Sequence, residues 1–140
     1  MKKILIVGED NACRSQMAEG WMRYYTKNYA EVTSAGVVAS PLDLNAAHAM
    51  SQAIIDISKQ TSKTLESVVN ETYDFVLFVF TPTNLTAFSF NGAPQIVVKP
   101  FLRPISGASK KETDANYAKI QDEIENYCFE FVHQYVRKMY

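Results

Sequence analysis

The chain has 140 residues, which suits one domain of about 100–200 residues. Its 14 Lys and Arg nearly balance its 15 Asp and Glu, and 47% of its residues are hydrophobic. These values exclude a disordered tail, a collagen-like chain and a highly charged coiled coil. The lack of a basic excess also argues against a nucleic-acid binder.

The apolar runs are too short to cross a bilayer, which takes about 20 residues. The longest are Ile4–Val7 and Phe75–Phe80. The two cysteines, Cys13 and Cys128, lie far apart and have no partners at metal-binding spacing, so neither a disulfide framework nor a metal or cofactor site is expected. We therefore expect one cytoplasmic domain over residues 1–140, with neither nucleic acid nor a membrane as a partner.

The first half of the chain alternates strand and helix patterns. Lys2–Val7 is short and β-branched, which is typical of a buried strand, and a polar turn over residues 8–14 follows it. From Ser15 to Tyr25, apolar residues recur at three- and four-residue steps, which predicts a helix. The next expected elements are a strand at Glu31–Ser34, a helix at Asn45–Ile54, and a short helix at Ser62–Val69 capped by Thr61 or Ser62.

Two further strands and a long helix are expected in the second half. Phe75–Phe80 is apolar throughout, which indicates a central parallel strand covered on both faces. Gln95–Val98 is a shorter fourth strand. Ser109 and Glu112 fit a capping box at the start of the last helix. One face of that helix carries an apolar stripe, made of Tyr117, Ile120, Ile124, Tyr127, Cys128, Phe131, Val132, Tyr135 and Val136.

This order of elements predicts an α/β three-layer sandwich, a parallel four-stranded sheet with helices on both faces. Ligands of such sheets bind beyond the carboxyl ends of the strands, which places the candidate site in the turn over residues 8–14. Backbone amides of a strand–loop–helix turn and the positive end of the helix together favour an anion. Arg14 at the close of the turn can offer a planar guanidinium to two oxygens of a phosphate-like ion.

The segment from Asn11 to Trp21 reads Asn-Ala-Cys-Arg-Ser-Gln-Met-Ala-Glu-Gly-Trp. It resembles the signature of the low-molecular-weight protein tyrosine phosphatase family, nearest to its thioredoxin-coupled arsenate reductases. The resemblance spans essentially the whole chain and implies a phosphotyrosine phosphatase I-like fold with strand order 2-1-3-4. Further matches to family motifs are Ser34-Ala35-Gly36, Ala49-Met50, Ile55–Ser58 with Thr61-Ser62, and Phe101 with Pro104.

The start of the loop departs from the family pattern. Gly8 stands where the resemblance implies the nucleophilic cysteine, and a glycine has no side chain with which to form a covalent intermediate. Glu9 and Asp10 replace the Thr and Gly that follow it. A carboxylate within about 4 Å of a bound anion costs about 4 kcal/mol at an effective dielectric near 20.

Other positions to which the resemblance assigns chemistry also differ. Arg103 stands where the family has its general acid, the Asp before a proline, here Pro104. Phe80 and Ala87 stand where the reductase branch has the two cysteines of its disulfide relay. The resemblance and these departures together predict a family member that has lost catalysis.

The positions that match the family are candidates for oxyanion binding: Asn11, Ala12, Cys13, Arg14 and Ser15. The resemblance implies that Asn11 braces the loop, that Arg14 binds the oxyanion and that the Ser15 hydroxyl bonds the nucleophile, a partner that Gly8 would remove. Two alternatives stay open for Arg14: it binds an anion, or it forms a salt bridge with Glu9 or Asp10.

Two competing hypotheses concern other residues. Cys13 lies beside Arg14 at a helix start, where a thiolate is favoured, which makes it a candidate nucleophile or redox-sensitive thiol in an active phosphatase or reductase. Alternatively, an aromatic rim formed by Phe88 and Phe90 would bind a protein partner if it were exposed. The more ordinary reading of that rim is a loop held by its own phenyl rings.

Overall fold

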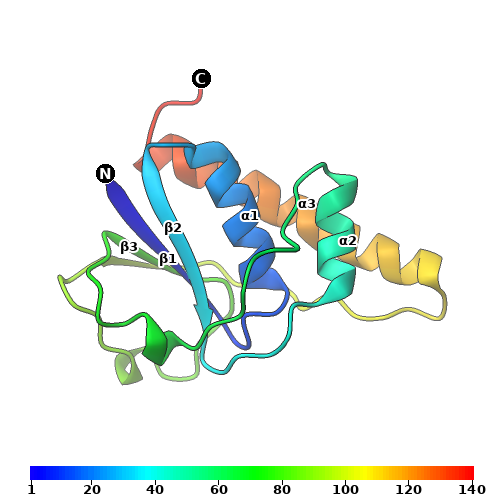
Figure 1. The fold of residues 1–140 in the computed structure, drawn as a ribbon, viewed down its shortest axis with the longest axis horizontal. Helices are drawn as coiled ribbons and strands as arrows, with labels where there is room; N and C mark the ends of the chain where they lie inside the picture. The colour runs from blue at the N-terminus through cyan, green and yellow to red at the C-terminus, as the bar shows by residue number, and fades with distance from the viewer.

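The computed structural model describes residues 1–140 and contains one parallel sheet of four strands, in the order β2-β1-β3-β4 (Figure 1). This confirms the predicted strand order and α/β fold class, but the α-helices cover one face of the sheet and not both faces as predicted. The strands are β1 (Lys2–Gly8), β2 (Ala30–Gly36), β3 (Phe75–Phe78) and β4 (Gln95–Val98). The α-helices are α1 (Arg14–Thr26), α2 (Leu44–Gln52) and α3 (Lys110–Tyr135).

The central strand β1 divides its side chains between the two faces of the sheet. Ile4 and Ile6 belong to the larger core cluster, together with residues of the three α-helices. Leu5 and Val7 belong to a smaller cluster on the opposite face. All four are fully buried, as expected for a strand between two parallel neighbours.

The three α-helices pack together on one face of the sheet, and α1 lies against both α2 and α3 (Figure 1). Polar contacts also join them: the Trp21 indole donates a hydrogen bond to Gln121 Oε1 at 2.8 Å. At the start of α3, the Ser109 hydroxyl accepts a hydrogen bond from the Glu112 amide at 3.1 Å, which confirms the predicted cap. Cys128 on this helix is fully buried, in the core position that its place on the apolar stripe indicates.

The opposite face of the sheet is covered mainly by irregular chain. Its only helical turns are two short 3₁₀ helices, η1 (Leu65–Ser67) and η2 (Leu85–Ala87). The α-helix expected over Ser62–Val69 is therefore wrong: only Leu65 and Val68 in it are buried, a pair that a single 3₁₀ turn can place against the sheet. The expected cap is also wrong, because the Ser62 hydroxyl donates to the Asn11 carbonyl.

Most other element boundaries differ from the prediction by one or two residues. β3 ends at Phe78, two residues before the end of the predicted apolar strand, and α2 ends at Gln52. None of the helices is both long and apolar enough to pass through a bilayer.

Candidate functional site

The candidate site is the loop between β1 and α1, at the carboxyl end of the sheet. Hydrogen bonds tie its carbonyls to the chain after β2: the amides of Val37 and Val38 donate to Gly8 and Glu9 at 3.2 and 3.0 Å. Gly36 permits this close approach, because a Cβ atom there would lie 2.7 Å from the amide nitrogen of Asn11. The matched Ser-Ala-Gly segment thus supports the loop from behind.

Asn11 braces the inside of the loop, in the role that the family resemblance implies. It is fully buried at a positive φ of 53°, a backbone region that Asn tolerates better than most residues. Its Nδ2 donates to the hydroxyls of Ser15 and Ser34, both at 2.9 Å, and its Oδ1 accepts from the Lys63 amide at 2.8 Å. The Ser34 hydroxyl in turn donates to Glu19 Oε1 at 2.6 Å.

This network gives Ser15 a partner other than the nucleophile that Gly8 removes. Its hydroxyl accepts the Asn11 hydrogen bond, and its side chain also lies against Gly8. A Cβ atom at Gly8 would lie 2.6 Å from Ser15 Oγ and 2.8 Å from Ser15 Cβ, closer than side-chain atoms ordinarily pack. Ser15 therefore occupies the space in which a side chain at position 8 would begin.

Arg14 forms the salt bridge that was one of the two alternatives for it. Its side chain is 9% exposed, and its Nη2 lies 2.5 Å from Glu9 Oε1. Its Nη1 donates to the Phe101 carbonyl at 2.8 Å, which holds the guanidinium against the chain after β4. Among the amides of residues 9–13, that of Ala12 donates to Asp10 Oδ1 at 3.3 Å, and the others have no protein acceptor.

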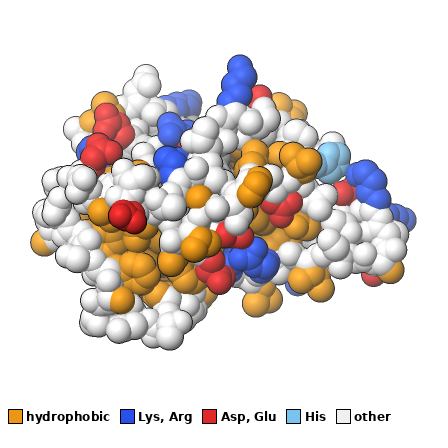
Figure 2. Space-filling model, turned by 60° about the horizontal axis from the view of Figure 1, so that its bottom comes forward, with side chains coloured by type: hydrophobic (Ala, Val, Ile, Leu, Met, Phe, Trp, Pro, Cys, Tyr) orange, Lys and Arg blue, Asp and Glu red, His pale blue; other side chains and the backbone are white.

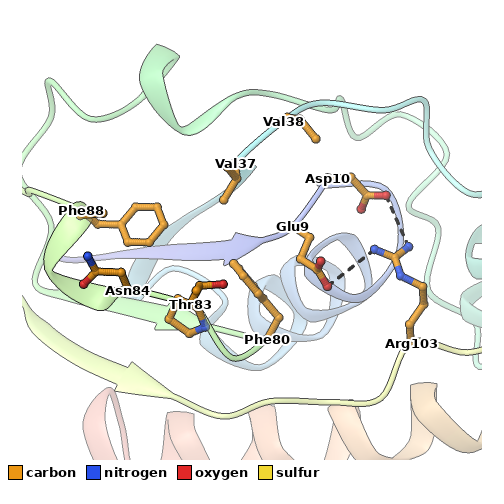
Figure 3. A pocket seen from close by; sticks show the side chains of 11 residues that line it. Glu9, Asp10, Val37, Val38, Phe80, Thr83, Asn84, Phe88 and Arg103 are labelled. Atoms are coloured by element: carbon orange, nitrogen blue, oxygen red, sulfur yellow. Dashed lines mark hydrogen bonds and ion pairs between the residues drawn. The ribbon is translucent and has the colours of Figure 1, made fainter.

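Arg103 closes the outer side of the same charge cluster (Figure 3). Its Nη1 lies 3.4 Å from Asp10 Oδ2, and its Nη2 lies 3.8 Å from Glu9 Oε1. Two acidic and two basic side chains thus meet at the loop, and their formal charges cancel. The acids that would repel a bound anion are paired with arginines instead.

Cys13 lies at the N-terminal cap of α1, but the expectation of a favoured thiolate is wrong. The residue is 2% exposed, and burial is the main reason that the pKa of its thiol rises to about 12. The Asp43 carboxylate raises the pKa further, and the opposing effects of Arg14 and Arg103 are smaller. Its position beside Arg14 and a helix start does not outweigh the loss of water.

Beside the loop lies a cavity of about 500 Å³, which we call the apolar hollow (Figure 3). Its walls include Val37, Val38, Phe80, Pro82, Ala87 and Phe88, and it opens toward Glu9 and Arg103. On the face of the molecule in Figure 2, hydrophobic side chains gather next to acidic and basic groups. Phe80 and Ala87 stand where the reductase branch has its relay cysteines, and both line this cavity.

The aromatic rim is held by its own rings, as the more ordinary reading of that segment predicts. Phe80, Phe88 and Phe90 surround the buried Phe78, with ring centroids 6.1, 5.2 and 6.3 Å from it. None of the three is fully exposed, and all pack against the smaller core cluster. These rings therefore pack into the fold and do not form a fully exposed aromatic face.

Sequence reasoning missed Val37 and Val38, which line the hollow although each is about half exposed. Their one signal is their position directly after Gly36, at the carboxyl end of β2, where residues of a parallel sheet gather around a ligand. It also missed the carbonyl of Phe101 as a partner of Arg14, because a backbone contact across 87 residues leaves no mark in a residue pattern.

The sheet order, the loop after β1 and the arginine that closes it define a phosphatase-type α/β domain. A family model described as low molecular weight phosphotyrosine protein phosphatase matches residues 3–139, so the chain belongs to that family. This confirms the resemblance found in the sequence.

The chain is also similar to several arsenate reductases. It is 43% identical to that of Bacillus subtilis (strain 168) over 76 residues, which are 54% of this chain and 55% of the relative. It is 40% identical to the glutaredoxin arsenate reductase of Synechocystis sp. over 77 residues, 55% of this chain and 59% of the relative. The matches thus span little more than half the length of these curated relatives.

Solved structures extend the likeness to nearly the whole fold. An arsenate reductase in its phosphate-binding state is 29% identical, with a TM-score of 0.69 over 93% of this chain and 98% of that one. The low molecular weight protein tyrosine phosphatase from T. tengcongensis is 22% identical, with a TM-score of 0.79 over 96% and 99% of the two chains. The second likeness shows the fold alone.

Proposed function

We propose that this chain is a family member that has lost catalysis of phosphoryl and arsenate chemistry and acts as a binding protein. Covalent catalysis in such a loop needs a nucleophile at the point where the amides and the helix end converge. Position 8 is Gly, and the Ser15 side chain fills the adjacent space. That observation carries the proposal, because position 8 offers no side-chain atom that could attack phosphorus or arsenic.

The remaining groups do not supply a substitute. The pKa of the Cys13 thiol, raised to about 12, leaves little thiolate at neutral pH, and the side chain is buried. A guanidinium remains protonated in proteins, so Arg103 cannot donate a proton to a leaving group as a carboxylic acid would. Nucleophile and acid are therefore both missing from the positions where this family's chemistry needs them.

Oxyanion binding is the part of the family's function that these residues can still support. Amides of residues 9–13 without a protein acceptor lie next to the N-terminus of α1, and Arg14 is fixed beside them. The Glu9 carboxylate already occupies Arg14, so an external anion must compete with it. The proposed function is thus weak oxyanion binding without turnover.

Two assays test the loss of catalysis. Hydrolysis of p-nitrophenyl phosphate tests phosphatase activity, and reduction of arsenate with thioredoxin tests reductase activity, with the Bacillus subtilis arsenate reductase as a positive control for the second assay. We expect rates equal to those of an Arg14→Ala variant of this chain. Turnover above that variant in either assay would contradict the proposal.

A further inference from the structure

Two hollows meet at the loop and share Glu9, Phe80, Thr83 and Arg103 in their walls. One is the apolar hollow. The other, which we call the charged hollow, has a volume of about 510 Å³ and is lined by Arg14, Phe101 and Leu102 in addition to the shared residues. Cavities of about 300–1,000 Å³ are the usual size of small-molecule sites, and each hollow alone reaches that size.

The chain's own Glu9 carboxylate lines the charged hollow, where it is paired with the two arginines. Glu9 Oε1 lies 2.5 Å from Arg14 Nη2 and 3.8 Å from Arg103 Nη2, so two guanidiniums face one carboxylate oxygen. The two partners differ in how firmly they are held. The Arg14 side chain is 9% exposed and is fixed by the Phe101 carbonyl, whereas the Glu9 side chain is 51% exposed and makes its polar contacts with these two arginines.

We propose that the joined hollows bind a small organic carboxylate with an apolar body. Its carboxylate replaces that of Glu9 on Arg14 and Arg103, and its body lies in the apolar hollow between Val37 and Phe88 (Figure 3). This inference rests on the proposed function, because it assigns a ligand class to a loop that performs no chemistry. Arg103 has a direct role in it, as the second guanidinium facing the anion.

Charge decides between an anionic and a cationic ligand. Both carboxylates of the cluster already have arginine partners, and Arg14 is the least exposed of the four groups. A cation taking Glu9 would leave the buried Arg14 guanidinium without its carboxylate, a costly exchange. An anion that displaces Glu9 keeps Arg14 paired and releases an already half-exposed side chain into water.

The internal carboxylate also sets how strongly an external one binds. A group tethered by a few residues competes at an effective concentration on the order of millimolar. Wild-type protein should therefore bind a simple aromatic carboxylate weakly, and removal of the Glu9 charge should strengthen binding by about tenfold or more. Asp10 provides the matched control, since it carries the same charge one residue away but does not contact Arg14.

Titrations with benzoate, followed by the amide NMR signals of residues 8–14, test this inference on the full chain. We expect Glu9→Gln to lower the Kd for benzoate by about tenfold or more and Asp10→Asn to lower it by less than about threefold. Adding Arg103→Ala to Glu9→Gln should return the Kd toward the wild-type value. Three further probes separate the features of the ligand. Acetate lacks the apolar body, inorganic phosphate lacks the carboxylate, and benzylamine carries the opposite charge.

Equal benzoate affinities of wild type and Glu9→Gln would overturn the inference, as would an equal gain in Asp10→Asn. Tighter binding of benzylamine than of benzoate would overturn the inference that the ligand is an anion. Acetate or phosphate binding to Glu9→Gln as tightly as benzoate would overturn the role of the apolar hollow. Hydrolysis of p-nitrophenyl phosphate by Glu9→Gln, measured separately, would contradict the proposed function, whereas a failed titration without hydrolysis would contradict only the ligand assignment.

Discussion

The two sides of the loop after β1 differ in how they follow the family pattern. The inner side, which we call the loop floor, comprises Asn11, Ser15, Ser34 and Glu19, all buried and joined by hydrogen bonds. All four match the family's motifs. The outer side, the loop mouth, comprises Glu9, Asp10, Arg14 and Arg103, and only Arg14 matches.

The difference follows from what each side does for the fold. A buried polar group that loses its partner destabilises the protein, so the members of the loop floor depend on one another. Three of the four side chains of the loop mouth are partly exposed, and its charges can change together if they continue to neutralise each other. A loop can thus keep its backbone support while the charged residues at its mouth change. The predictions below test this contrast.

The largest expected effect concerns Cys13, which lies between Asn11 and Arg14 in the sequence of the loop. Its pKa, raised from 9.0 to about 12, leaves roughly a thousandfold less thiolate at neutral pH than an ordinary thiol. In a Cys128→Ala background, alkylation by iodoacetamide should therefore be slow in the folded protein and fast in urea, with a folded-state midpoint far above pH 9. A midpoint at or below pH 9 would restore Cys13 as a candidate nucleophile.

The same shift predicts the direction of a pH effect on stability. Because the folded pKa of Cys13 lies above its ordinary value, the unfolded chain releases the thiol proton first as the pH rises. The free energy of unfolding should then fall between about pH 9 and pH 12, and less so in a Cys13→Ala variant. Urea denaturation at several pH values measures this difference, and parallel curves for the two proteins would count against it.

The loop floor should be sensitive to the loss of Asn11. Asn11→Ala removes donors to Ser15 and Ser34 and the acceptor of the Lys63 amide, and should lower the free energy of unfolding by about 3 kcal/mol. The exposed Asn28 offers a matched control, because Asn28→Ala should change the free energy of unfolding by less than about 0.5 kcal/mol. Urea denaturation compares the two, and similar losses would refute the contrast.

The junction between Gly8 and Ser15 should show a strong coupling. Gly8→Ala places a Cβ atom against Ser15 and should cost about 2 kcal/mol of stability. Ser15→Gly removes the obstructing atoms. The double variant should therefore lose less unfolding free energy than the two single variants lose together, by about 1 kcal/mol or more. Additive effects in this double-mutant cycle would show that Ser15 does not fill the space at position 8.

The smallest effect is expected in the loop mouth. Arg103→Ala removes ion pairs with Asp10 and Glu9 that lie at 3.4 and 3.8 Å between partly exposed side chains. It should lower the free energy of unfolding by less than about 1 kcal/mol, and 1 M salt should reduce the difference further. A loss as large as that of Asn11→Ala would mean that the loop mouth supports the fold as much as the loop floor does.

The sequence predicted the sheet, the long helices and the position of the loop because these depend on local periodicity and on a specific motif. Gln95–Val98 and the cap at Ser109 are exact matches. It failed over Ser62–Val69, where the side chain of Ser62 bonds a distant carbonyl instead of capping a helix.

Within the site, the sequence identified the loop residues and named the Arg14–Glu9 pair as an alternative. It could not choose between that pair and an anion, because the choice depends on how Phe101 holds the guanidinium. It also placed Cys13 correctly at a helix start but misjudged its thiol, since burial by other elements is not visible in the neighbouring residues.

The central claim is that this loop forms no covalent intermediate, and intact-mass spectrometry tests it most directly. The protein is incubated with p-nitrophenyl phosphorothioate and quenched with acid, next to a catalytically active member of the same family. The account predicts that the mass of this chain remains unchanged while the active relative gains a thiophosphoryl group. A thiophosphoryl adduct on this chain, mapped to any residue of the loop, would contradict it.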